Sequence, residues 1–175
     1  NLNGVDFLNG TTAEVRNTLF VQNENAAIRC ISASPQIEAN LITQNSLTGF
    51  ESAVVCNASN STIQLNLIYG NGNSGIDCAN GATASIYQNT LADNLFGITV
   101  SDSDPVLRNN LITGSVTGIS CENAEPEIGF NNVFGNSNEN YLNCPAGVGV
   151  FTTVNFNNDA SDIFFNISRD PLYVD

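Results

Sequence analysis

The chain has 175 residues, of which 42% are hydrophobic, and its formal net charge is −13. This length is typical of one domain, and the hydrophobic content is enough for a core. Seventeen acidic residues stand against four arginines, with no lysine and no histidine, so nucleic acid and anionic membranes are poor partners. Metal cations suit the charge better.

The sequence has no apolar run of about 18 residues and no basic leader before an apolar stretch. We therefore expect neither a membrane span nor a signal peptide. The chain begins within a strand of the repeat described next and ends in a tail motif. This suggests a mature or excised piece of a longer secreted protein with neighbouring domains.

A repeat of about 22 residues runs through almost the whole chain, and a column of cysteines marks it most clearly. The five cysteines are 26, 22, 43 and 23 residues apart. Val100 divides the interval of 43 into 22 and 21 and so completes the column. Its members are Cys30, Cys56, Cys78, Val100, Cys121 and Cys144.

In chain order, starting with a partial unit at 4–7, each unit holds three short apolar stretches separated by polar turns. The first stretch has an apolar residue two positions before the cysteine: Ile28, Val54, Ile76, Ile98, Ile119 and Leu142. The second has its apolar residue seven or eight positions after the cysteine, in a column headed by Val15: Val15, Ile37, Ile63, Ile86, Leu107 and Ile128. The third follows five residues later: Phe20, Ile42, Ile68, Leu91, Ile112 and Val133.

Apolar residues alternate within these stretches, as in Ile28-Arg29-Cys30, which is the period of a β-strand. Short strands repeated at a period of about 20 to 50 residues indicate a solenoid or a propeller. A propeller blade needs about 40 residues, so the shorter period favours a solenoid. We predict an all-β parallel β-helix with three short strands per coil and about six to seven coils over residues 1–146. Residues 147–175 leave the repeat and are predicted to cap the same domain.

Two polar columns fall at the turns. The first is Thr18, Asn40, Asn66, Asn89, Asn110 and Asn131, and the second is Asn23, Asn45, Asn71, Asn94, Ser115 and Asn136. Asparagine tolerates the left-handed backbone region that a sharp corner requires. Stacked asparagines can also hydrogen-bond to one another from coil to coil. We therefore predict asparagine ladders with the asparagines at the corners.

The cysteine column lies between outward positions, so its side chains should point into the core, where free cysteine behaves as a small hydrophobe. Neighbouring coils bring cysteines within the Cα separation that a disulfide accepts, and at most two bridges could form. Parallel neighbours point their Cβ atoms the same way, which suits a disulfide badly. We favour stacked free thiols over bridges. A zinc site would need a different spacing of cysteines and histidines.

The stretch Asn66-Leu67-Ile68-Tyr69-Gly70-Asn71, followed by Gly75-Ile76-Asp77-Cys78, resembles the right-handed parallel β-helix repeat of pectate-lyase-like proteins. The resemblance covers residues 4 to about 146. The ending 166–175, with Asp-Pro-Leu-Tyr-Val-Asp, resembles a segment that closes the β-helix in large secreted bacterial surface proteins. The resemblance implies a secreted or cell-surface location. In enzymes of this superfamily it implies an arginine or lysine base beside calcium-binding aspartates, or aspartates with a histidine.

Acidic turns in consecutive coils form one candidate site. Asp104-Pro105 and Glu125-Pro126 occupy equivalent positions, with Asp102 and Glu122 nearby. Stacked like charges are unfavourable, and Ca²⁺ held by these four carboxylates would relieve them. The alternative is a set of solvated turns without metal. An enzyme would use Arg108 with Asp102, Asp104 and Glu125.

Outward residues offer a second kind of site. Tyr69, Tyr87 and Arg108 are candidates for binding sugar rings, and a leucine stripe at positions 19, 41, 67 and 111 would form a partner surface if exposed. Asp77 stands alone on its face, whereas glycosidases need two carboxylates. We therefore predict a non-catalytic secreted or cell-surface module that acts as a rigid spacer, binds extracellular polysaccharide, or both. The alternative is a polysaccharide lyase or glycoside hydrolase.

Overall fold

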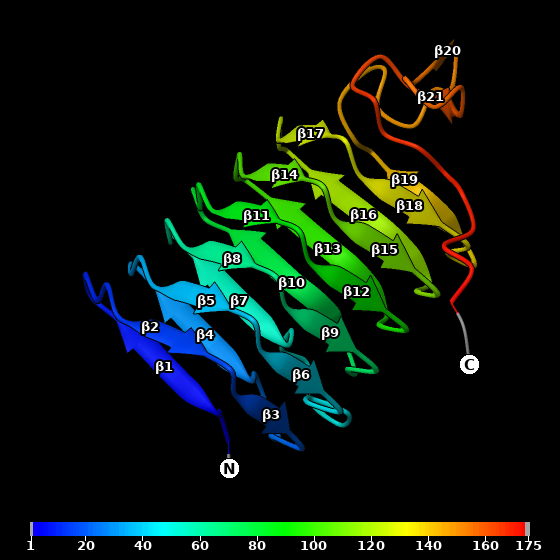
Figure 1. The fold of residues 1–175 in the computed structure, drawn as a ribbon. Helices are drawn as coiled ribbons and strands as arrows, with labels where there is room; N and C mark the ends of the chain where they lie inside the picture. The colour runs from blue at the N-terminus through cyan, green and yellow to red at the C-terminus, as the bar shows by residue number, and fades with distance from the viewer. Residues whose placement is uncertain (1, 174–175) are drawn as a thin grey trace.

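Each repeat folds into a coil of three short strands, and successive coils stack in parallel register. The structure is a computed structural model that describes residues 2–173. Figure 1 shows the coils side by side, with each strand next to its equivalent in the following coil and the C-terminal segment folded over the far end. The predicted all-β solenoid with three strands per coil is confirmed.

The strands form three parallel sheets that run along the rod. Sheet A contains β1 (Val5–Leu8), β4 (Ile28–Ile31), β7 (Val54–Asn57), β10 (Ser74–Ala79), β13 (Phe96–Ser101), β16 (Thr117–Glu122) and β19 (Glu139–Leu142). Sheet B contains β2 (Glu14–Arg16), β5 (Gln36–Glu38), β8 (Thr62–Gln64), β11 (Ser85–Tyr87), β14 (Val106–Arg108) and β17 (Glu127–Gly129). Sheet C contains β3 (Leu19–Val21), β6 (Leu41–Thr43), β9 (Leu67–Tyr69), β12 (Thr90–Ala92), β15 (Leu111–Thr113) and β18 (Asn132–Phe134).

The core consists of apolar columns stacked inside the coil. Ile76 pairs in register with Val54 and Ile98, and all three side chains have no exposed surface. Cys78 lies between Cys56 and Val100 in the same way. Val100 is therefore confirmed as the member of the cysteine column that stands in place of a cysteine. Because every inward position meets its own equivalent one coil later, the repeat in the sequence becomes a continuous core.

Two asparagine ladders line the corners at either end of the sheet C strands, and both were predicted. In the first, Asn66 Oδ1 accepts the backbone N–H of Asn40 at 2.9 Å and the side-chain amide of Asn40 at 3.0 Å. The pattern repeats along the column to Asn131. Its backbone N–H and its side-chain amide both donate to Asn166 Oδ1 in the C-terminal segment. The second ladder runs from Asn23 to Asn94 and meets Ser115, whose buried hydroxyl has no hydrogen-bond partner among the described residues.

The prediction that the ladder asparagines adopt the left-handed conformation is wrong. The left-handed residue directly precedes each asparagine, with φ of 54° at Ala39, 58° at Leu65 and 58° at Gln88. Gln44 and Gly70 do the same before the second ladder, with φ of 54° and 62°. The physical reason is that the asparagine must direct its amide inward along the ladder, so its neighbour makes the corner.

The last coil departs from the predicted register by one residue. Ile119 pairs with Tyr141 and Ser120 with Leu142, so the alignment of Leu142 with Ile119 is wrong. Tyr141 takes the inward position, and its ring lies so close to Gly149 that a Cβ there would be 2.5 Å from it. The tyrosine thus fills the end of the core beneath the capping residues.

Residues 147–173 pack over the end of the coils. A short antiparallel hairpin, β20 (Thr153–Val154) and β21 (Ala160–Ser161), precedes a segment in which Ile167 bridges to Asn132 of β18. The buried carboxylate of Asp162 accepts the backbone N–H groups of Gly149, Phe164 and Asn166 at 2.8 to 2.9 Å. Val174 and Asp175, the end of the predicted closing motif, lie outside the described residues.

Candidate functional site

A groove of about 480 Å³ lies on the outward face of sheet A. The row on its floor contains Val55 of β7, Asp77 of β10 and Thr99 of β13, which are register neighbours, and Ser120 of β16 continues it. Side chains alternate between the two faces of a strand. The inward isoleucine and cysteine columns therefore force this intervening row to face outward.

One wall of the groove is the loop between β6 and β7. Cys30 and Cys56 are 26 residues apart, whereas the next interval is 22, so this coil carries an insertion. The loop places Phe50 and Glu51 at the groove, and the Phe50 side chain is 95% exposed. An exposed aromatic ring thus borders the groove.

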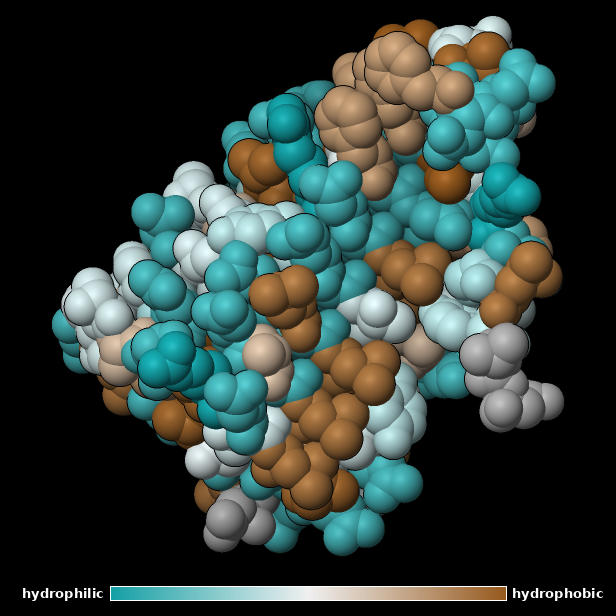
Figure 2. Space-filling model, viewed as in Figure 1, coloured by the Kyte–Doolittle hydropathy of each residue, from teal (hydrophilic) through white to brown (hydrophobic). Residues whose placement is uncertain are grey.

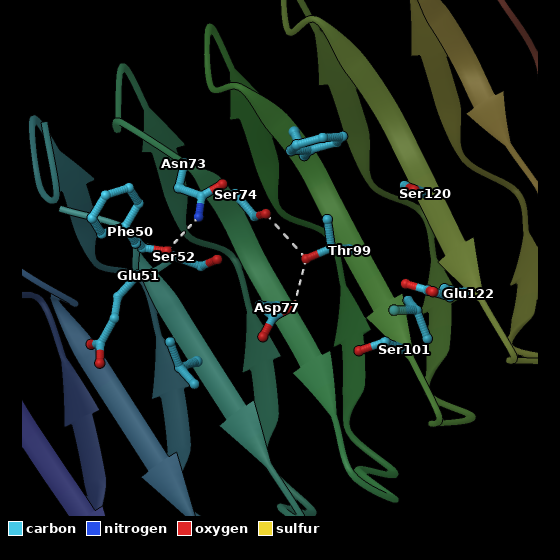
Figure 3. Close-up of a pocket in the computed structure, with 13 residues that line it drawn as sticks. Phe50, Glu51, Ser52, Asn73, Ser74, Asp77, Thr99, Ser101, Ser120 and Glu122 are labelled. Carbon is cyan, nitrogen blue, oxygen red and sulfur yellow. Dashed lines mark hydrogen bonds between the residues drawn. The ribbon is translucent and has the colours of Figure 1, made fainter. Parts of the chain in front are cut away.

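The next coil holds this loop in place. Asn73 Nδ2 donates to the carbonyl oxygen of Phe50 at 2.6 Å, as Figure 3 shows. A Cβ at Gly72 would lie only 2.0 Å from the carbonyl oxygen of Ser46, so glycine is required for the loop to pack this closely. Both contacts fix the position of this loop relative to the outward row of sheet A.

Asp77 is the half-buried acid of the floor. The Thr99 hydroxyl donates to Asp77 Oδ1 at 2.6 Å and lies 3.1 Å from the Ser74 hydroxyl (Figure 3). Burial raises the pKa of Asp77 above its ordinary value, and the hydrogen bond from Thr99 opposes that shift. Among the described residues, the hydrogen bond to Asp77 is made at Oδ1, and none is made at its second carboxylate oxygen.

The groove combines hydroxyl, amide, carboxylate and aromatic groups. Its lining residues are Phe50, Glu51, Ser52, Val55, Asn73, Ser74, Asp77, Phe96, Thr99, Val100, Ser101, Ser120 and Glu122. Hydroxyls and amides both donate and accept hydrogen bonds, and carboxylates accept them. Such a surface can recognise a ligand rich in hydroxyl groups, while the two phenylalanine rings offer it flat apolar faces.

Arg108 lies on sheet B, away from this groove. It is in register with Tyr87 on one side and Gly129 on the other. Its guanidinium forms an ion pair with Glu127 and sits 5.8 Å from the ring centroid of Phe130. The structure therefore places Arg108 beside Glu127 of the adjacent strand, and its use with Asp102, Asp104 and Glu125 in an enzyme stays a prediction.

The acidic turns do stack, but one carboxylate is engaged by the backbone. Asp104 Oδ1 accepts the backbone N–H of Glu125 at 2.8 Å. Asp102 occupies a left-handed corner with φ of 48°, and Glu122 lines the sheet A groove. Within residues 2–173 no group of three or more acidic, cysteine or histidine side chains is placed to hold a metal ion. Calcium binding by these four residues stays a prediction.

Tyr69 and the leucine stripe lie on sheet C, so the structure does not bring Tyr69 together with Tyr87 and Arg108. Leu19, Leu41 and Leu67 are register neighbours on β3, β6 and β9, with exposed fractions of 58%, 36% and 41%. Figure 2 shows hydrophobic side chains gathered over these strands. The stripe is thus exposed at these three leucines, whereas Leu111 of β15 is only partly exposed.

The cysteines are free thiols, and four of them are buried. Cys121 and Cys144 have their sulfur atoms 3.2 Å apart despite the shifted register of the last coil. The hydrogen bond with Cys56, together with burial, raises the pKa of the Cys30 thiol, and the contact with Cys121 raises that of Cys144. The expected inward stack of reduced cysteines agrees with this arrangement.

Sequence reasoning missed most of the groove. It singled out Asp77 but gave it no neighbours, because Thr99, Ser74 and Phe50 share no motif with it. One signal was available: the interval of 26 residues between Cys30 and Cys56 marks an insertion directly before the strand that borders Asp77. Insertions in a solenoid map to loops on one face, often the binding face.

Comparison with known proteins yields one match. A family model described as "Right handed beta helix region" matches residues 1–134. No curated protein and no solved structure matches the chain. In the part of the chain that the structure describes, no helix is long and apolar enough to cross a membrane.

Proposed function

The chain belongs to the right-handed β-helix family, and we propose that it is a non-catalytic module of a secreted or cell-surface protein that binds an extracellular polysaccharide. The observation that carries this proposal is the groove on sheet A, where Asp77, Thr99 and their neighbouring hydroxyls lie beside the exposed ring of Phe50. Sugars present hydroxyl groups around a ring with apolar faces, and the groove offers partners for both.

The shape of the groove supports an extended polymer. Its lining comes from four consecutive strands, β7, β10, β13 and β16. At about 4.8 Å between strands, these span roughly 14 Å along the rod, which accommodates more than one sugar ring. A polysaccharide lying along the rod would meet the same kind of outward position in every coil.

The charge of the groove narrows the class of polysaccharide that it can bind. Glu51, Asp77 and Glu122 all line it, and the whole chain carries −13. Like charges disfavour polymers of uronic acids, so neutral or amino-sugar polymers are the preferred class. The asparagine ladders add rigidity along the rod, which suits a module that also separates neighbouring domains.

A glycoside hydrolase acting on such a polymer is the second candidate. One observation favours it: Asp77, whose pKa is raised, lines the same groove as Glu122. Glycosidases use two carboxyl groups that flank one glycosidic bond, and a raised pKa suits the one that acts as the acid. A lyase or hydrolase built on Arg108 would instead act on sheet B, where Arg108 is paired with Glu127.

Isothermal titration calorimetry against neutral, amino-sugar and uronic acid polysaccharides tests the proposal. Asp77→Asn should weaken binding at least tenfold, because it removes a charged hydrogen-bond acceptor. Glu38→Gln on β5 of sheet B makes the same change in charge away from the groove and should leave affinity unchanged. Binding to no polymer in the panel, or an equal loss in both variants, would refute the proposal. Release of reducing ends that Asp77→Asn abolishes would decide for the hydrolase.

A further inference from the structure

Two phenylalanines occupy corner positions where the other coils mostly have small or polar residues. The residue before each member of the first polar column is left-handed, and in the earlier coils it is Asn17, Ala39, Leu65, Gln88 and Asn109. In the last two turns it is Phe130 and Phe165, with φ of 60° and 63°. Bulky residues in this region cost about 1 to 3 kcal/mol each and often mark functional positions.

These two rings are part of a longer stack. The centroids of Phe130 and Phe165 are 5.3 Å apart with an interplanar angle of 14°. Phe156, in the turn between β20 and β21, stacks on Phe165 at 6.3 Å and 8°. Arg108 closes the other end over Phe130. Phe156 is fully exposed, so one of its faces is open to solvent.

The stack borders a hollow of about 260 Å³. Its lining residues are Asn109, Phe130, Asn132, Asn155, Phe156, Asn157, Phe165 and Ile167. None of these described residues is charged, although the chain contains 17 acidic residues. Figure 2 shows hydrophobic side chains gathered at this capped end of the rod, between β17 and the β20–β21 hairpin.

The polar groups around the hollow are side-chain amides. Asn132 and Asn155 are held by the protein itself, through Arg169 and through the turn at 157–159. The amides of Asn109 and Asn157 are exposed, and each can donate and accept hydrogen bonds. Uncharged amides beside a stack of rings suit a ligand that is itself neutral, flat and rimmed with hydroxyls.

We infer that this hollow, here called the cap site, binds a sugar ring of a neutral glycan. The apolar face of the ring would lie on Phe156 and the stack behind it, and its hydroxyls would meet Asn109 and Asn157. The cap site lies at the corner between sheets B and C, whereas the groove lies on sheet A. It is therefore independent of the proposed function, and the two can be tested separately.

Phe156→Ala is the test, because a fully exposed ring can be removed without disturbing the core. Calorimetry with neutral β-linked hexasaccharides of glucose, xylose and mannose should give binding that Phe156→Ala weakens about two- to tenfold. Phe156→Tyr should retain the affinity, and the melting temperature should not change in either variant. The resonances of the Asn109 and Asn157 side-chain amides should shift on titration.

Phe50→Ala is the matched control, because it removes an equally exposed ring from the sheet A groove. It should leave cap-site binding, read by the two asparagine amide resonances, unchanged. Binding by none of the three hexasaccharides would overturn the inference. Equal affinity of Phe156→Ala and the unaltered protein would do so as well. Loss of binding in Phe50→Ala alone would assign the ligand to the groove and remove the cap site.

Discussion

Asn66→Ala should destabilise the protein by about 4 kcal/mol. Asn66 Oδ1 accepts two hydrogen bonds from Asn40, and the two hydrogens of its amide are shared among the carbonyl oxygens of Ile37 and Gln64 and the side-chain oxygen of Asn89. This amounts to about four hydrogen bonds at a net value of about 1 kcal/mol each. Asn66 is buried, so water cannot replace them.

Urea denaturation followed by circular dichroism measures this change, and thermal melting provides a second reading. A loss of about 4 kcal/mol corresponds to a fall of roughly 8 to 16 °C in melting temperature for a chain of this size. Thr18→Ala is the control at the end of the same column, where the side chain makes a single hydrogen bond to Arg16. It should cost about 1 kcal/mol or less. A loss below about 1 kcal/mol for Asn66→Ala would show that the ladder does not stabilise the stack.

Three further outcomes are expected. Gly72→Ala should lower stability by about 1 to 3 kcal/mol in denaturant melts, because the new methyl group meets the backbone of Ser46; an unchanged midpoint would refute that packing. Burial raises the folded-state pKa of Asp77, so its contribution to stability is present below the ordinary aspartate pKa and lost as pH rises through the raised value. Asp77→Asn should flatten that part of the pH–stability profile, and an identical slope in both proteins would contradict it. Thiol titration in denaturant without reductant should count five thiols per chain, whereas a count of three would establish a bridge.

The periodic part of the fold could be predicted from the sequence because a solenoid places equivalent positions of successive repeats next to one another. Ile76, Cys78 and Asn89 each meet their equivalents in the neighbouring coils, so identifying the period was enough to place them. The corner conformation was assigned to the wrong residue. A left-handed residue and an inward asparagine are adjacent in every coil, and the pattern alone does not separate their roles.

The end of the rod was predicted less well, because the periodic restraint stops there. The cysteine spacing of 23 before Cys144 suggested that Leu142 faces inward, yet Tyr141 takes that position to fill the space below Gly149. Nothing in the repeat encodes this contact, since the capping residues have no equivalents in the other coils.

The candidate site likewise has features that the repeat predicts and features that only the folded chain shows. The repeat alone predicted that Asp77 faces outward on one strand column, and that Arg108 and Tyr87 face outward on another. Only the folded chain decided that the inserted loop brings Phe50 to the groove that Asp77 lines, and that Arg108 pairs with Glu127. The position of the backbone follows from the stacking of the coils, and the period of the sequence repeat predicts this stacking directly. A long exposed side chain or an inserted loop can make several alternative contacts of similar energy. Which contact forms depends on residues that have no periodic relation to one another.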